Sequence, residues 1–240
     1  MTPQPALRLS DVAFSWRRGG FSLRVPAFTV EHGRRVLLTG PSGSGKSTLL
    51  NLICGVVSAE KGAVEVLGTD LMRLSRAQRD RFRAEHIGVV FQMFNLVPYL
   101  SIIDNVLLPL RFAPGRARCA RDGGGEEAEA RRLLGALALD PSLYRRPVTE
   151  LSVGQQQRVA AARALVGSPE LVIADEPTSA LDQDRQAAFL SLLFGELGRI
   201  GATLLMVSHD VRLGPQFDEV VRLDAVATIS DGAGERSSHP

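Results

Sequence analysis

The chain has 240 residues, of which 45% are hydrophobic and 22% are charged, the composition of a globular protein with one large domain or one domain with a subdomain. The formal net charge of +2 is too small to indicate a nucleic acid or an anionic membrane surface as partner. The two cysteines, Cys54 and Cys119, lack the spacing of a disulfide framework or a zinc site. No apolar run approaches a membrane span and the N-terminus lacks a signal-peptide core, so we expect a soluble chain in the cytoplasm.

The N-terminal segment shows the alternation of half-exposed strands. Apolar side chains alternate with polar ones in one phase up to Leu9 and in the opposite phase from Val12 onward. This change of phase predicts a bulge or turn near residues 10–11. Residues 21–25 and 63–67 alternate as well. We predict that these segments form an antiparallel sheet beside a parallel one.

Residues 40–47 read Gly-Pro-Ser-Gly-Ser-Gly-Lys-Ser and fit the Gly-x-x-x-x-Gly-Lys-Ser/Thr pattern of a phosphate-binding loop, between an apolar run at 36–39 and a helical stretch at 48–54. The glycines let the backbone curl so that successive N–H groups point at phosphate oxygens. Lys46 can reach the β- and γ-phosphates, and the Ser47 hydroxyl can ligate a Mg²⁺ ion that bridges them. The residues of this segment expected to bind the cofactor are Gly40, Pro41, Ser42, Gly43, Ser44, Gly45, Lys46, Ser47 and Thr48.

Four continuous apolar runs each end in polar residues suited to phosphate chemistry. They are residues 36–39 before the glycine loop, 87–91 before Gln92, 171–174 before Asp175 and Glu176, and 204–208 before His209. Such runs predict strands of a parallel sheet with helices on both faces, whose ligands bind beyond the carboxyl ends of the strands. We therefore expect the four endings to converge on one edge. There Asp175 can hold Mg²⁺ and Glu176 can polarise a water for attack on the γ-phosphate, the alternative being two solvent-facing acids.

Residues 95–150 are expected to be helical and less regular. Within them, the arginine- and glycine-rich stretch at 116–127 predicts a mobile loop, followed by a helix from about residue 126 to 139. The arginines between residues 73 and 83 predict a solvated helix face, with a membrane or nucleic-acid patch as the alternative. The residues from about Ser230 onward predict a disordered tail.

Ser152 stands at a natural helix N-cap, with Gln155 three residues further on, which is the arrangement of a capping box. Two interpretations of this helix start stay open. It is either only a well-capped helix, or a second phosphate-binding helix end that uses the Ser152 hydroxyl and the Gly154 N–H.

Residues 151–158, Leu-Ser-Val-Gly-Gln-Gln-Gln-Arg, resemble the signature sequence of ATP-binding cassette (ABC) ATPases. The phosphate loop, Gln92, this signature, residues 174–182 and residues 208–210 follow in the order of that family. The resemblance covers nearly the full chain and implies an α/β fold: a P-loop NTPase core with a parallel sheet flanked by helices, an N-terminal antiparallel β subdomain and an inserted α-helical subdomain. The implied division is one domain at residues 1–229, with a core at about 1–92 and 165–229 and a helical subdomain at about 93–164, and a disordered tail at 230–240.

The resemblance also implies roles for single residues. Trp16, or in second place Phe14, would stack on adenine, with ordinary core packing as the alternative. Gln92 would contact Mg²⁺ or the attacking water. His209 would contact the γ-phosphate, the alternative being a local hydrogen bond at a strand end. Asp182 would lie at a dimer interface. The implied catalytic residues are Lys46, Gln92, Glu176 and His209, and the implied metal ligands are Ser47, Gln92 and Asp175.

The signature helix implies a site shared between two chains. Ser152, Gly154 and Gln155 would complete the ATP site of the opposite protomer, so that two ATP molecules lie between two head-to-tail subunits. The family usually has glycine where this chain has Val153, whose β-branched side chain stands near the closing interface. The segment at residues 94–99 would receive a coupling helix from a membrane subunit.

The resemblance thus implies an ATP-hydrolysing subunit of an ABC transporter, with ATP and Mg²⁺ as cofactors. It would form a homodimer or heterodimer and drive a separately encoded integral-membrane permease at the cytoplasmic face of the inner membrane, with no nucleic acid as partner. Residues 40–51, 87–98 and 104–110 resemble the branch of lipoprotein release and macrolide export. The alternative is a family member that transmits force to cell-envelope enzymes as a regulator, without transporting a substrate. A member acting on DNA or ribosomes is disfavoured, because such proteins usually carry tandem cassettes or long coiled-coil insertions.

Overall fold

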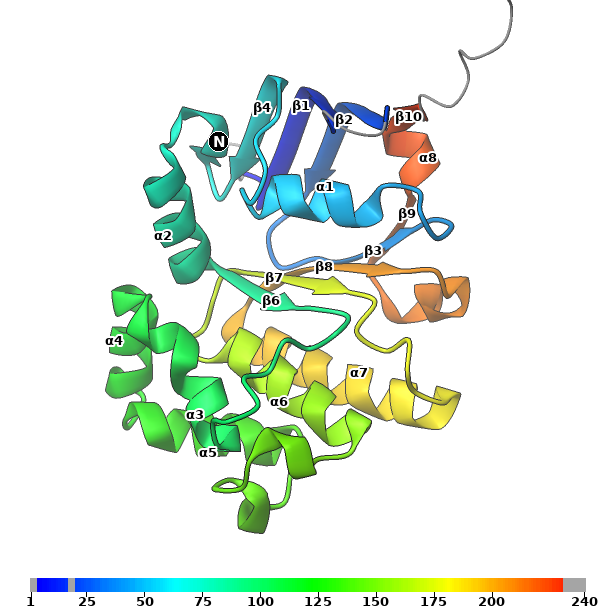
Figure 1. Cartoon of the computed structure of the whole chain (residues 1–240). Coiled ribbons are helices and arrows are strands. Elements are labelled where there is room, and N and C mark those ends of the chain that lie inside the picture. The colour runs from blue at the N-terminus through cyan, green and yellow to red at the C-terminus, as the bar shows by residue number, and fades with distance from the viewer. Residues whose placement is uncertain (1–3, 17–19, 231–240) are drawn as a thin grey trace, which may run out of the picture.

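The computed structural model describes residues 4–16 and 20–230 of the chain. Its strands form two sheets, and α1 (Lys46–Ile53) lies between them (Figure 1). Helices α6 (Val153–Leu165) and α7 (Gln183–Ile200) cover the other face of the lower, parallel sheet. The helices and sheets are thus layered in the α/β manner that the sequence predicts.

The parallel sheet contains the four predicted strands and a fifth that was not predicted. Its order is β6-β7-β8-β3-β9, and all neighbouring strands run parallel. The unpredicted strand is β9, a short edge strand. The bounds are β3 Arg35–Thr39, β6 Ile87–Val90, β7 Leu171–Asp175, β8 Thr203–Ser208 and β9 Glu219–Arg222.

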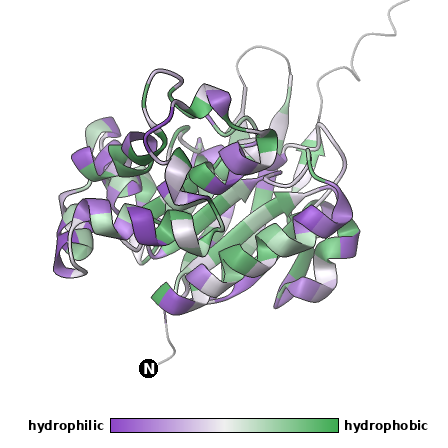
Figure 2. Ribbon diagram, turned by 90° about the horizontal axis from the view of Figure 1, so that it is seen from below, coloured by the Kyte–Doolittle hydropathy of each residue, from purple (hydrophilic) through white to green (hydrophobic). Residues whose placement is uncertain are grey.

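Alternate residues of the parallel strands face two different cores. In β8, Leu204 and Met206 pack with residues of α6 and α7, whereas Leu205 and Val207 pack with residues of α1 and the antiparallel sheet. Figure 2 shows hydrophobic residues gathered on these central strands. Because both faces of the sheet are covered, successive positions within such a strand are apolar, as at residues 204–207 of β8, which is the pattern visible in the sequence.

The antiparallel sheet has the order β10-β2-β1-β4-β5. The predicted bulge is present: on the side of β4, Ser10 pairs with Ala63 but Ala13 pairs with Lys61, so β1 has one extra residue. Asp11 takes a φ of 50° within this bulge. The extra residue lets side chains of both phases, before and after it, reach the same core. The bounds are β1 Leu7–Ser15, β2 Ser22–Val30, β4 Lys61–Val66, β5 Thr69–Asp70 and β10 Thr228–Ser230.

The segment between β6 and β7 is mainly helical, as predicted. Helix α6 contacts both β6 and the helices α3 and α5, so the boundary of a helical subdomain at residues 93–164 remains a prediction. The helix predicted from about residue 126 begins there but ends at Ala136. Before β6, a 3₁₀ turn at Leu71–Arg73 precedes α2 (Arg76–His86). Between β6 and α6, the helices are α3 Ile102–Leu107, α4 Pro114–Asp122 and α5 Glu126–Ala136, with 3₁₀ turns at Leu108–Arg111, Pro141–Leu143 and Val148–Glu150.

The prediction of a mobile loop at residues 116–127 is wrong, because Pro114–Asp122 form helix α4. Ala117 and Ala120 pack into the core. The Arg116 side chain, 4% exposed, donates to the carbonyls of Ala164 at 2.8 Å and Val166 at 2.9 Å. This burial lowers the pKa of Arg116 to about 10. Only the glycines that follow α4 form a turn.

The prediction of a solvated arginine face is correct only in part. Arg83 of α2 is half-buried, and its Nη1 donates to the Cys54 carbonyl at 3.2 Å. Arg79 is half-buried as well. The arginines that are exposed as predicted are Arg73, Arg76 and Arg81.

The end of the described chain joins both sheets. Strand β9 pairs with β3 of the parallel sheet, α8 (Leu223–Val226) follows, and β10 pairs with β2 of the antiparallel sheet. Ser230, where the disordered tail was predicted to start, still belongs to β10, and residues 231–240 lie outside the described residues. Among the helices described, none has both the length and the apolar composition needed to cross a membrane.

Candidate active site

The carboxyl ends of β3, β6, β7 and β8 surround one cleft of about 550 Å³. The four polar strand endings therefore converge as predicted. Ser152, Gly154, Gln155 and Asp182 do not line this cleft. The residues that do are Trp16, Phe21, Ser42, Gly43, Gly45, Lys46, Ser47, Thr48, Gln92, Asp175, Glu176 and His209.

The backbone of the glycine loop needs two of its glycines for conformational reasons. Gly43 and Gly45 have φ angles of 77° and 82°, in the left-handed region that other residues rarely adopt. Gly45 is also the N-cap of α1, and a Cβ placed on it would lie 2.8 Å from Cζ of Phe21. The first N–H groups of α1 have no partner within the helix, which makes this end suited to an anion.

The Lys46 ammonium lies across the mouth of the loop. Its Nζ donates to the carbonyls of Gly40 and Pro41, each at 2.8 Å, and is 4.0 Å from Oε1 of Glu176. The residue is only 6% exposed. Nearby, Oγ of Ser44 is buried and has no hydrogen-bond partner among the described residues. The loop therefore holds a buried cation at the cleft, and next to it in the loop a buried hydroxyl without a partner among the described residues.

Ser47 and Asp175 bring two oxygen ligands together from different elements. The Ser47 hydroxyl, in the first turn of α1, donates to Oδ2 of Asp175, at the end of β7, over 3.0 Å. Gln92, which follows β6, lines the same cleft. All three predicted metal ligands thus border one space.

Glu176 is held in an unusual backbone conformation next to His209. Its φ is 47°, and its N–H donates to the Val207 carbonyl at 3.0 Å. Its Oε2 lies 2.8 Å from Nδ1 of His209. The Glu176 side chain is 11% exposed, whereas that of His209 is 58% exposed. A non-glycine residue in this region persists only where its surroundings hold it, which is common at catalytic positions.

Trp16 and Phe21 form the aromatic side of the cleft. Trp16 is 43% exposed and packs edge-on against Phe14, with ring centroids 4.9 Å apart, while Phe14 is 7% exposed. Of these two, Trp16 is therefore the ring that a ligand can reach. Its Nε1 lies 3.4 Å from Oγ1 of Thr48. Phe21 was not predicted as a site residue, since its place in an alternating strand pattern shows nothing of its contact with Gly45.

A comparison with known protein families shows to which family a chain with this cleft belongs. The family model described as ABC transporter matches residues 23–179. The chain belongs to the ABC transporter family. The predicted family, the predicted α/β fold and the prediction of an ATPase are thereby confirmed.

Named relatives of this ABC ATPase include two kinds of transport protein. The lipoprotein-releasing system ATP-binding protein LolD of Novosphingobium aromaticivorans is 42% identical over 226 residues, covering 91% of this chain and 96% of LolD. The macrolide export ATP-binding/permease protein MacB 1 of Aeromonas hydrophila is 38% identical over 231 residues, covering 95% of this chain but 34% of MacB 1. The chain thus spans about a third of the latter protein.

A solved structure of similar fold is that of the ATP-binding cassette MJ0796, a dimer in a post-hydrolysis state bound to ADP and Pi. It is 31% identical, has a TM-score of 0.77, and the match covers 95% of this chain and 99% of that chain. The likeness extends over almost all of both molecules, so the two share the complete cassette fold.

The signature helix of this ABC ATPase begins with the predicted capping box. The Gln155 N–H donates to Oγ of Ser152 at 3.4 Å, and the Ser152 N–H donates to Oε1 of Gln155 at 2.9 Å. Val153 is 50% exposed at this tip. Asp182 caps α7, where its Oδ1 accepts from the Arg185 N–H at 2.9 Å. The Ser152 tip thus lies outside the cleft of its own chain, with Val153 exposed beside it.

Proposed function

We propose that two copies of this ABC ATPase bind two Mg-ATP head-to-tail and use hydrolysis to drive a separate membrane permease, of the lipoprotein-release or macrolide-export type. The observation that carries this proposal is the division of the site. The cleft unites the glycine loop, Asp175, Glu176 and His209, but the Ser152 tip lies outside it. A second copy is the natural source of that tip, and the dimeric form of MJ0796 supports this.

The donors of the cleft fit a magnesium-bound triphosphate. Ser47 and Asp175 offer hydroxyl and carboxylate oxygens 3.0 Å apart, and Gln92 adds an amide oxygen. Oxygen ligands of this kind suit Mg²⁺, which when bound neutralises charge on the β- and γ-phosphates. The unpartnered Ser44 hydroxyl offers a further donor to the triphosphate. Trp16 offers an exposed ring for the base.

The side chains divide the chemistry between them. Lys46 exchanges the Gly40 and Pro41 carbonyls for phosphate oxygens, which are stronger partners for an ammonium group. His209 engages Oε2 of Glu176, which leaves Oε1 to accept a proton from the attacking water. Ser152 of the second copy donates its hydroxyl to the same phosphate. When the two copies close around ATP, both supply hydrogen-bond donors to its γ-phosphate. Loss of the γ-phosphate after hydrolysis therefore weakens the contact between the two copies.

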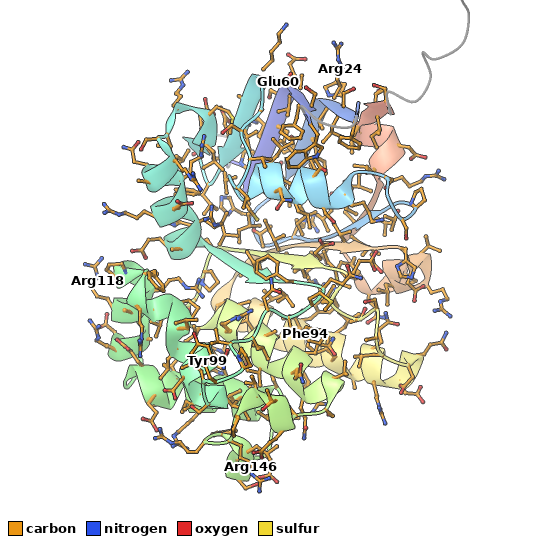
Figure 3. The ribbon with its side chains drawn as sticks, in the orientation of Figure 1. Arg24, Glu60, Phe94, Tyr99, Arg118 and Arg146 are labelled. Atoms are coloured by element: carbon orange, nitrogen blue, oxygen red, sulfur yellow. The ribbon has the colours of Figure 1, made fainter. Side chains whose placement is uncertain are left out.

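A second cavity, of about 590 Å³, supports docking on a membrane protein. It lies between α2 and the helical segment and is bordered by exposed apolar residues, with Phe91 43% and Phe112 66% exposed. On the segment after β6, Phe94 is buried while Tyr99 is 85% exposed (Figure 3). We assign this groove to a helical segment of the permease, which would hold the ATPase at the cytoplasmic face of the inner membrane.

Glu176→Gln tests the proposed site. The amide keeps the shape of the side chain but cannot accept the proton, so ATP binds and hydrolysis falls by about two orders of magnitude or more. Light scattering is expected to show a dimer that forms only with Mg-ATP and persists. Glu31→Gln, an exposed glutamate on a loop, is the control and remains active. Hydrolysis at the parent rate by Glu176→Gln contradicts the assignment of the base, and a purely monomeric ATP complex contradicts the shared site.

A further inference from the structure

Residues 92–95, which we call the Gln92 turn, have an unfavourable backbone conformation that contacts with other parts of the chain must stabilise. Phe94 and Asn95 are consecutive residues with φ angles of 58° and 50°. Neither is glycine, and two such residues in a row are rare outside a site where surrounding contacts impose them. The turn also places Gln92 in the nucleotide cleft. What holds this turn therefore also holds Gln92.

The Arg163 guanidinium holds both residues of the turn. Its Nη2 donates to the Phe94 carbonyl at 2.5 Å and its Nη1 to the Asn95 carbonyl at 2.6 Å. Arg163 is 9% exposed, and burial lowers the pKa of this guanidinium. The forked donor geometry of arginine fits two adjacent carbonyls, which a single ammonium group cannot match. The Phe94 ring adds an apolar contact in the core that includes α6.

Arg163 stands on the helix that begins at Ser152. Helix α6 runs from Val153 to Leu165. At a rise of about 1.5 Å per residue, Arg163 lies roughly 16 Å from the Ser152 tip along one uninterrupted helix. The C-terminal end of α6 therefore binds the Gln92 turn of its own chain through Arg163. The N-terminal end of the same helix carries Ser152, which contacts a second copy in the proposed function.

We propose that Arg163 is a positioning residue that makes the Gln92 turn and the Ser152 tip move as one body. A contact of Gln92 with the triphosphate side of its own cleft then sets where α6 presents its tip to the partner copy. The role rests on the proposed two-copy function. This role requires that loss of the Arg163 hydrogen bonds to the Gln92 turn leaves ATP binding to the single chain unchanged, while the rate of hydrolysis and the formation of the ATP-bound dimer both fall.

Arg163→Gln and Arg163→Lys test this role, with Arg132→Gln as the control. Arg132 lies on α5 and donates charged hydrogen bonds too, to Glu129 at 3.0 Å and to Glu196 at 2.8 Å, without touching the Gln92 turn. The expected result for Arg163→Gln is an ATP dissociation constant within about twofold of the parent and turnover per bound nucleotide reduced about tenfold, the size of a typical coupling between sites. Arg163→Lys, which keeps the charge, is expected to fall between, and Arg132→Gln to match the parent in turnover per bound nucleotide.

Counting turnover per bound nucleotide removes the contribution of unfolded chain, and thermal unfolding of each variant checks folding. In a Glu176→Gln background, Arg163→Gln is expected to need about tenfold more ATP to form the dimer. Parent-like turnover and parent-like dimer formation by Arg163→Gln overturn the proposal, as does an equal loss in Arg132→Gln. A Glu176→Gln parent that never dimerises contradicts the two-copy function instead, and the turnover comparison then decides the role of Arg163 alone.

Discussion

Lys46 shows how one side chain is prepared for its ligand. Its ammonium group is buried, and two backbone carbonyls of its own loop accept its hydrogen bonds. Burial of a cation without such partners is costly, so the loop must offer them until a phosphate does. The same carbonyls keep the side chain extended across the loop, where a phosphate meets it without rearrangement of α1.

Lys46→Ala is expected to weaken ATP binding roughly 10- to 150-fold, because the loss of even one charged hydrogen bond to phosphate removes about 1.5–3 kcal/mol. Lys61→Ala is the matched control, since Lys61 is exposed on β4. Titration calorimetry with Mg-ATP measures both variants. An unaltered dissociation constant in Lys46→Ala rules out the phosphate-loop assignment.

Motif spacing was enough to predict the glycine loop, Asp175 and Glu176, and the family resemblance added Trp16, Gln92 and His209. Neither was enough for Phe21 and Arg163. Phe21 becomes a site residue only because the folded sheet places it over Gly45. Arg163 binds carbonyls 68 and 69 positions away in the chain. Backbone carbonyls are present at every residue, so no pattern of side chains indicates such a partner.

At the scale of elements, the longer strands were predictable, whereas the shortest strands and helix α4 were not. A buried strand has apolar residues in succession, and a half-buried strand alternates apolar and polar residues, so both can be recognised from the order of residues in the sequence. Helix α4 contains three arginines and is followed by three glycines, which together have the composition of a loop. Its stability comes from Arg116, which satisfies carbonyls at the end of α6. The strands β5, β9 and β10 were missed because they are too short to show a period.

Arg116→Met is expected to destabilise the protein by about 3 kcal/mol, because buried carbonyls of Ala164 and Val166 lose their donor. Arg118→Met is the control on the same helix, where Arg118 is exposed at the surface (Figure 3). Its effect is expected within about 0.5 kcal/mol. Urea unfolding measures both. Equal stability of the two variants contradicts the role of Arg116 as the anchor of α4.

The apolar rim of the groove between α2 and the helical segment is expected to carry the contact with the permease. Phe112→Glu places a charge at a lining side chain that is 66% exposed, so folding and ATP affinity should be unchanged while the fraction bound to permease-containing membranes falls. Val220→Glu in β9, at a position 47% exposed, is the control. Sedimentation with membranes measures this fraction. Unchanged sedimentation of Phe112→Glu argues against the groove as the docking site.

At the scale of the whole molecule, the last described segment connects the two sheets, and an ion pair fixes where it begins. Asp218, just before β9, accepts from the backbone N–H of Arg35 at 2.8 Å and from its Nη2 at 2.7 Å. The Arg35 hydrogen bonds lower the pKa of Asp218 to about 2. From this point the chain adds one strand to each sheet, so the start of β3 and the C-terminal segment are held together.

Asp218→Asn is expected to lower stability at pH 7 by on the order of 1 kcal/mol, a value reduced for the partial exposure of the pair. Because the pKa of Asp218 is lower in the folded chain than in the unfolded one, the carboxylate stabilises the fold at pH values above about 4. That contribution is lost as the pH falls toward 2. Urea midpoints of both proteins between pH 7 and pH 3 should therefore converge on acidification, and a constant difference contradicts this account.

The position of the Ser152 tip outside its own cleft has a consequence for mixtures of chains. In a site built from two copies, a variant with an inactive glycine loop still supplies a functional Ser152 tip to its partner. A variant with an inactive tip still supplies a functional glycine loop. Two inactive preparations then complement each other when combined, because one of the two sites in each mixed pair is whole. For the same reason, the specific activity of the isolated ATPase falls on dilution, as pairs separate into halves that cannot turn over.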